Sequence, residues 1–210
     1  MPSPQASFET PPAGSHGAVL VAIIDLGTQR ESFQGGPERD QHQIYLVWEL
    51  TGCKMTGSEH THLIGRRYTF SLAEKAALRR LVKSWRGRDV SSGEDFDVLA
   101  MLGKKCLLSI SHNESGDKVY ANLEGVFAPE PGRQVPDPKR KPVARQVTSA
   151  EPVPDWLPYI YGEPVLEVIK RAKELLPAAT NGSGAVLAAN GSLAARSDAK
   201  AAEEDQEIPF

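Results

Sequence analysis

The sequence has few of the residues that build covalent or catalytic centres. Its only two cysteines, Cys53 and Cys106, lie in separate segments without paired spacing, which predicts reduced thiols rather than a disulfide framework. No glycine-rich loop followed by lysine is present to cradle a phosphate, and no nucleophile elbow is present either. These absences argue against an enzyme, and we expect no catalytic residues.

Long apolar runs are also missing. No stretch approaches the length that a membrane-spanning helix needs, and the residues after Met1 lack a basic segment followed by an apolar one. The sequence therefore predicts an intracellular protein without a membrane partner.

A metal site is likewise poorly supported. His60 and His62 would point to the same face of a strand, but no Cys-x-x-Cys pair or fixed partner completes a tetrahedral set with them. His112 and the two cysteines lie in other segments. We expect no metal and no cofactor.

The charge is unevenly distributed along the chain. The net charge of −3 arises from the tail: residues 1–150 carry 19 Lys/Arg and 17 Asp/Glu, whereas residues 151–210 carry 5 and 10. Between Arg66 and Arg88, eight basic residues face one acid, Glu74. This local excess favours a phosphate-facing surface, although a solvated helix face would explain part of it.

Apolar patterning lies mainly between residues 17 and 127 and predicts strands, a helix and a hairpin. Residues 17–27 form a β-branched segment that is apolar on both faces and closed by Gly27, and residues 28–40 form a flexible loop. Residues 43–50 alternate, and a third strand follows near residues 62–70. Ser71 and Glu74 form a capping box that starts a helix ending at Gly87. A short helix at 96–102 and a hairpin of residues 105–112 and 118–127 complete the pattern.

This order of elements predicts the fold class. Three strands, a helix and then a hairpin is the order of an OB-fold, a five-stranded partly open barrel, although other small barrels share it. We therefore expect a mainly β chain with one or two helices, an OB-fold domain at residues 15–130 and a disordered segment at residues 1–14.

Residues after 130 change in character. Seven prolines between Pro131 and Pro158 predict an extended path over the barrel surface, and residues 163–176 predict one more helix, which would dock on the barrel or on a second subunit. We divide this part into a Pro-rich extension with a short helix (131–177), a flexible linker (178–202) and an acidic interaction tip (203–210).

The tip has the properties of a peptide that other proteins bind. Phe210 can fill a pocket while its terminal carboxylate pairs with a cation, Pro209 lowers the ordering cost, and the acids speed encounter with a basic surface. The candidate partner-binding residues are Asp205, Glu207, Ile208, Pro209 and Phe210.

Two stretches resemble known DNA-metabolism proteins. The acidic run ending in Ile208-Pro209-Phe210 resembles the C-terminal tip of bacterial single-stranded-DNA-binding proteins (SSBs), which recruits replication, repair and recombination enzymes. The body is similar to SSB-like proteins encoded by phages, with matching stretches that include residues 24–29, 45–50 and 84–88. The resemblance implies a single-stranded-DNA-binding protein in the cytoplasm of a bacterium or phage-infected host, associated with the nucleoid.

Candidate residues for single-strand binding follow from the usual OB-fold surface, the outer face of the second and third strands with flanking loops. Tyr45 lies opposite the apolar face of its strand and is the first choice for stacking, with Tyr68 as a second platform. The set comprises Tyr45, Arg66, Arg67, Tyr68, Phe33, Lys54, Arg86, Arg88 and Tyr120.

Two alternatives stay open. The tip could target the SSB-binding enzymes of a host without any DNA binding, or the barrel could bind single-stranded RNA, because no residue identifies a contact to a 2′-hydroxyl. A homo-oligomer is also compatible with the sequence.

Overall fold

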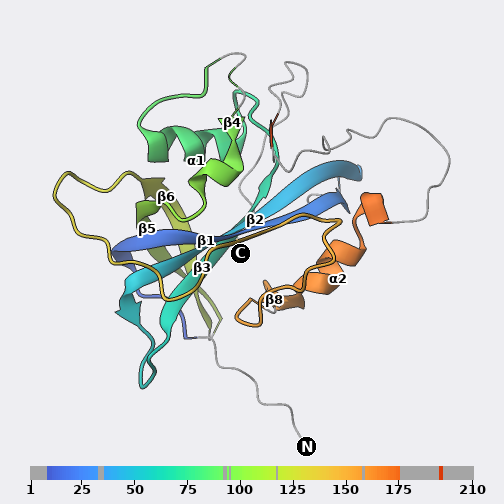
Figure 1. The fold of residues 1–210 in the computed structure, drawn as a ribbon. Helices are drawn as coiled ribbons and strands as arrows, with labels where there is room; N and C mark the ends of the chain where they lie inside the picture. The colour runs from blue at the N-terminus through green and yellow to red at the C-terminus, as the bar shows by residue number, and fades with distance from the viewer. Residues whose placement is uncertain are drawn as a thin grey trace, which may run out of the picture.

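A long, curved sheet organises the chain, with one helix against each face (Figure 1). The computed structural model describes residues 9–32, 36–91, 94, 96–116, 118–157 and 159–175, with the backbone of residues 194–195. The elements are β1 (Gly14–Glu31), β2 (Arg39–Lys54), β3 (Thr61–Thr69), α1 (Ala77–Arg86), β4 (Phe96–Asp97), the 3-10 helix η1 (Val98–Met101), β5 (Lys105–Ser115), β6 (Lys118–Phe127), β7 (Val143–Arg145), β8 (Tyr159–Ile160), β9 (Glu163–Pro164), α2 (Val165–Lys170), η2 (Lys173–Leu175) and β10 (Ala194–Ala195).

The main sheet has six strands in the order β3-β2-β1-β5-β6, with β7 beside β1. The five long strands pair antiparallel, and β7 pairs parallel with β1. Within the described residues no backbone ladder joins the two end strands, β3 and β6, so the sheet is not closed. The prediction of a mainly β chain with one or two helices is confirmed, whereas the five-stranded, partly open OB barrel stays a prediction.

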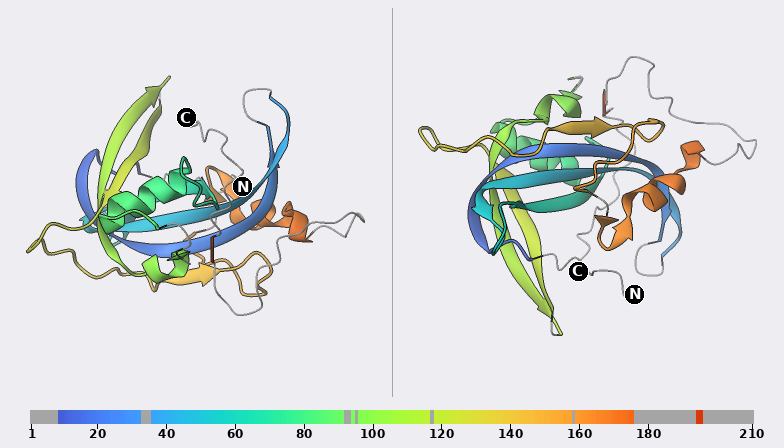
Figure 2. Two further views of the ribbon diagram at one scale, coloured as in Figure 1. Left: turned by 90° about the horizontal axis from the view of Figure 1, so that it is seen from above. Right: turned by 60° about the horizontal axis from the view of Figure 1, so that its bottom comes forward.

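The first hairpin is longer than predicted. β1 and β2 remain paired from Thr28↔His42 to Glu31↔Arg39, so the predicted loop at residues 28–40 is wrong at both ends. Gly27 does not close the strand: the register shifts between Asp25 and Gly27, and the bulge lets the ladder continue. The left view of Figure 2 shows this hairpin and the β5–β6 hairpin rising from opposite ends of the sheet.

The inner face of the sheet packs against α1. Alternation on β2 predicts one apolar face, and the side chains that share it (Ile44, Leu46, Trp48 and Leu50) are fully buried. The Trp48 and Trp85 rings lie 6.4 Å apart, which joins α1 to the sheet. Each large apolar side chain buried in this way contributes roughly 1.5–3 kcal/mol.

Helix α1 begins later than its capping signature predicts. It starts at Ala77, and its N-cap residue Ala76 provides no side-chain hydrogen bond. The Ser71 hydroxyl instead accepts a hydrogen bond from the Ala73 amide within a turn, so the predicted start at Ser71 is wrong. The predicted end is confirmed, because Gly87 adopts the left-handed conformation at the C-cap.

The outer face of the sheet is covered by residues 131–175, called here the extension. Its apolar side chains, among them Val135, Val147, Ile160 and Val168, pack on Val19, Val21, Ala22 and Ile24 in a second core. The predicted path of the extension over the sheet is confirmed. The predicted helix at residues 163–176 is divided into the short helices α2 and η2.

Residues 9–13, expected to be disordered, have defined contacts. The Glu9 carboxylate accepts hydrogen bonds from the amide and hydroxyl of Thr56, and the Thr10 hydroxyl donates to the Val119 carbonyl. The N-terminal segment is therefore held against the β2–β3 turn and β6.

Replacing Gly27 with alanine tests how closely the extension approaches β1. A Cβ at Gly27 would lie 2.6 Å from Ala172 Cβ and 2.8 Å from Val147 Cγ2. Overpacking together with positive φ should lower the free energy of unfolding by about 2–5 kcal/mol in urea melts. The matched control is Gly57→Ala, since Gly57 has nearly the same φ (67° against 69°) but open space around it. Equal losses in the two variants would contradict close packing at Gly27.

Candidate nucleic-acid interface

The outer face of β2 and β3, expected to bind bases, is occupied by the extension. Tyr45 is only 6% exposed, because its ring lies over Gly65 and packs edge-on against Tyr161, with the centroids 5.9 Å apart. The prediction that Tyr45 offers an open stacking surface is therefore wrong in this structure. The assignment failed because alternation predicts a face but not what covers it.

Arg67 lies on the same outer face and is engaged by neighbouring groups. Its guanidinium is 2.8 Å from a Glu31 carboxylate oxygen and 5.8 Å from the centroid of the Tyr161 ring. Its backbone amide donates to the Tyr161 hydroxyl (3.1 Å). This arrangement attaches the extension to the edge strand β3 and leaves Arg67 with a carboxylate partner.

Glu49 fastens the first part of the extension. Its fully buried carboxylate accepts hydrogen bonds from the Thr61 hydroxyl (2.6 Å) and from the amides of Lys139 (2.9 Å) and Arg140 (3.0 Å). Burial raises the pKa of Glu49, but these hydrogen bonds outweigh it and the net pKa is lowered. The carboxylate is therefore charged in the folded state and holds the extension as an anion.

Glu174 fastens the other end. Its carboxylate accepts hydrogen bonds from the amide (2.8 Å) and hydroxyl (2.6 Å) of Thr28. Nearby, the Gln29 side chain donates to the Val168 carbonyl (3.1 Å). With these contacts at both ends and an apolar core between, the extension is an integral part of the fold.

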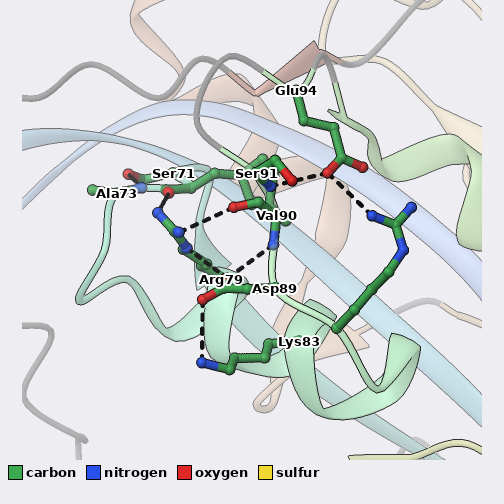
Figure 3. A network of polar contacts seen from close by, with 10 residues as sticks. Ser71, Ala73, Arg79, Lys83, Asp89, Val90, Ser91 and Glu94 are labelled. Atoms are coloured by element: carbon green, nitrogen blue, oxygen red, sulfur yellow. Dashed lines mark hydrogen bonds and ion pairs between the residues drawn. The ribbon is translucent and has the colours of Figure 1, made fainter.

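Four of the eight basic residues between Arg66 and Arg88 pair with two acids that follow them in sequence. Asp89 accepts hydrogen bonds from Arg79 (2.9 Å) and Lys83 (3.1 Å), as Figure 3 shows. These contacts lower the Asp89 pKa to about 2. Glu94 pairs with Arg86 (2.8 Å) and, at 3.5 Å, with Arg88. The Glu94 pKa is lowered first by the Ser91 amide and then by Arg86. Arg86 and Arg88, both predicted phosphate ligands, therefore already have a carboxylate partner.

The remaining predicted residues are scattered. Lys54 pairs with Glu59 at 2.7 Å in the β2–β3 turn, and Tyr120 is 40% exposed on β6. Phe33 lies outside the described residues, as do the predicted partner-binding residues Asp205, Glu207, Ile208, Pro209 and Phe210.

Two of the predicted residues, Arg66 and Tyr68, lie together at the open seam between β3 and β6. Arg66 donates to the Leu123 carbonyl of β6 (2.6 Å), and its guanidinium lies 5.6 Å from the centroid of the Tyr68 ring. Tyr68 is 6% exposed, so it supports Arg66 and does not present a free ring. One side chain thus bridges the gap that a backbone ladder would close.

A groove of about 230 Å³ opens at this seam between β3, α1 and β6. It is smaller than the roughly 300–1,000 Å³ of typical small-molecule sites, so it suits one flat group of a longer ligand. Its lining comprises Arg66, Tyr68, Ala77, Arg80, Leu81, Ser84, Leu123, Glu124, Gly125, Val126 and Phe127.

Two of the lining residues are not among the individually predicted site residues, although Arg80 belongs to the basic excess between Arg66 and Arg88. Arg80 is exposed and forms no ion pair with any described residue, and Phe127 is 47% exposed on β6. Phe127 leans over Gly125, where an added Cβ would lie 2.7 Å from the ring. The helical spacing placed Arg80 on the polar face of α1, but no local pattern shows that this face borders an open seam.

Comparisons with known proteins add no identification: no protein-family model matches the sequence, and no curated protein proves similar. Within the described part of the chain, no group of three or more His, Cys, Asp or Glu side chains could hold a metal ion. No helix there is long and apolar enough to cross a membrane.

Replacing Glu49 with glutamine tests how the extension is held. Glutamine replaces one of the two carboxylate oxygens with an NH₂ group, which then faces the Lys139 or the Arg140 amide as a second donor and removes the buried charge, so we expect a loss of about 2–4 kcal/mol in the free energy of unfolding at neutral pH. The control is Glu59→Gln. The Glu59 side chain is 84% exposed, so this substitution should change the free energy of unfolding little.

The pH dependence has a defined sign. The Glu49 pKa is lower in the folded state than in the unfolded state, where it is about 4.3. The ionised carboxylate therefore contributes its full share to the free energy of unfolding above pH 4.3, and this share is lost as the pH falls through the pKa of Glu49 in the folded state. Urea melts below pH 4.3 should therefore show a steeper loss of stability in the wild type than in Glu49→Gln. Parallel profiles would contradict a charged Glu49.

Proposed function

We propose that this chain is a non-enzymatic single-stranded-DNA-binding protein, built on an open variant of the OB-fold. The strand order and the position of α1 between β3 and the β5–β6 hairpin support this fold. In this view β3 and β6 are the strands that would close the barrel, and Arg66 spans their seam in place of a ladder.

The observation that carries the proposal is the composition of the seam groove. Arg66 and Arg80, neither of which pairs with a carboxylate among the described residues, line the groove together with the half-exposed Phe127. A cation for the backbone and an aromatic face for a base are the two requirements for sequence-tolerant binding of single strands. Glu124 also lines the groove, and it is engaged by the Ser111 hydroxyl.

The outer face is a weaker candidate for the same ligand. Tyr45 is covered, and the cations there have carboxylate partners: Arg67 pairs with Glu31, and Arg171 pairs with Glu163. A phosphate would have to displace an existing partner from each of them. The groove requires no such exchange at Arg80, because binding there only replaces counterions.

The second half of the proposal concerns the C-terminal tip. Residues 203–210 would recruit replication, recombination or repair enzymes, as the resemblance to bacterial SSB tips implies. Such a protein would act in the bacterial or phage-infected cytoplasm, near the nucleoid. Competition between DNA and RNA oligomers on the same protein separates this proposal from a single-strand RNA binder.

Replacing Phe127 with alanine should weaken binding of oligo-dT. Loss of one stacked base costs about 1–3 kcal/mol, which is roughly a 5- to 150-fold higher Kd by fluorescence polarisation. Arg80→Gln should also weaken binding and lower its salt dependence. The matched control is Tyr159→Ala, an aromatic with the same 47% exposure on the extension. Unchanged affinity in both groove variants would rule out the groove as the DNA site.

Removing residues 203–210 should separate the two halves of the proposal. Poly-dT affinity should be unchanged or higher at low salt, because a tethered polyanion no longer competes for the groove. The shortened chain should lose binding to an enzyme that recognises a bacterial SSB tip. Reduced poly-dT affinity, or retained enzyme binding, would contradict these roles.

A further inference from the structure

We propose that a second cationic surface, formed by Lys104, Lys105 and Lys141, continues the single-strand path beyond the seam groove. This inference rests on the proposed function. It adds three phosphate-binding residues that lie outside the groove and were not predicted from the sequence.

The three lysines are brought together by β1. Lys105 pairs with Val19 and the Leu20 amide donates to the Lys104 carbonyl, while Val143 of β7 pairs with Ala22. β5 and β7 therefore follow one another along the same edge of β1. Val19 and Ala22, the β1 partners of Lys105 and Val143, are three residues apart. At about 3.3 Å per residue, the first residues of β5 and β7 therefore lie about 10 Å apart along β1.

The two segments also come close to each other where the lysines lie. A Cβ added to Gly103, the residue before Lys104, would lie 3.9 Å from Cγ of Pro142, the residue after Lys141. Lys104 and Lys141 therefore belong to neighbouring segments.

The charge of this surface is only partly compensated. Lys104 and Lys141 are exposed and form no ion pair with any described residue. Lys105 is 2.8 Å from Asp137, whose carboxylate is 88% exposed and whose pKa is lowered chiefly by this hydrogen bond. An exposed pair of this kind is weak, so a phosphate can compete for Lys105.

Two contacts place the lining of the groove close to Lys105. Phe127, which lines the groove, pairs with Leu107, two residues after Lys105. On the other side, Ser84 lines the groove, and the indole of the adjacent Trp85 donates to the Lys105 carbonyl (3.1 Å). In this proposal a strand that leaves the groove past Phe127 continues toward Lys105.

The chemistry of the surface indicates which part of the ligand it contacts. Lysine is a compact, strongly hydrated charge without the planar fork that reads base edges. A set of three lysines also provides no aromatic ring on which a base could stack. The surface would hold phosphates without sequence preference, and it would matter only for strands long enough to leave the groove.

The test compares a short and a long oligomer on full-length protein. One oligo-dT has about 6 nucleotides, near the lower end of single-OB site sizes, and the other has about 30. The variant is Lys104→Gln/Lys141→Gln. The control is Lys170→Gln/Lys173→Gln, which removes the same charge from the α2–η2 segment on the outer face.

For the long oligomer, each lost phosphate contact should make the slope of log affinity against log salt concentration about 0.7 less steep, so two contacts should change it by about 1.4. Relative to 1 M salt, this corresponds to an affinity about 25-fold lower at 0.1 M salt. The short oligomer should bind the variant and the wild type equally. An unchanged long oligomer, equal weakening of both lengths, or an equal loss in the control would overturn the second surface. Failure of wild-type protein to bind either length would instead reject the proposed function.

Discussion

The structure depends on the fact that β1 is apolar on both faces. An apolar face must be removed from water, and a single α-helix can cover only one side of a sheet. Helix α1 covers the inner face, and the extension must cover the outer one. The proline-rich sequence suits this task, because it follows the sheet surface as an extended chain with few backbone donors left to satisfy.

Covering the outer face changes where a ligand can bind. In an OB-fold the outer face of the second and third strands is the usual ligand surface, but here it is a protein interior. Arg67 and Arg171 on this face are paired with acids, and Asp89 and Glu94 pair with three of the four cations of α1. At the seam, by contrast, Arg80 is exposed and has no carboxylate partner among the described residues.

Side-chain contacts at the seam protect the two end strands of the sheet, β3 and β6, from pairing with other chains. Unpaired edge strands are templates for aggregation, and proteins usually protect them. Here the Tyr161 hydroxyl accepts from the Arg67 amide of β3, while Arg66 and Thr10 donate to carbonyls of β6. These side chains satisfy backbone groups at the two edges without closing the sheet, and they leave room for the groove between them.

The sequence by itself determined the local elements: the alternation that buries Ile44, Leu46 and Trp48, the β5–β6 hairpin, and the end of α1 at Gly87. These features follow from periods of two or 3.6 residues and from turn chemistry, which act over a few neighbours. Only the tertiary structure decided that Tyr45 is covered by Tyr161, that Glu49 holds Lys139 and Arg140, and that Arg80 and Phe127 share a groove. Each of these contacts joins residues roughly 50 to 120 positions apart, and no local periodicity specifies which distant segment fills a given surface.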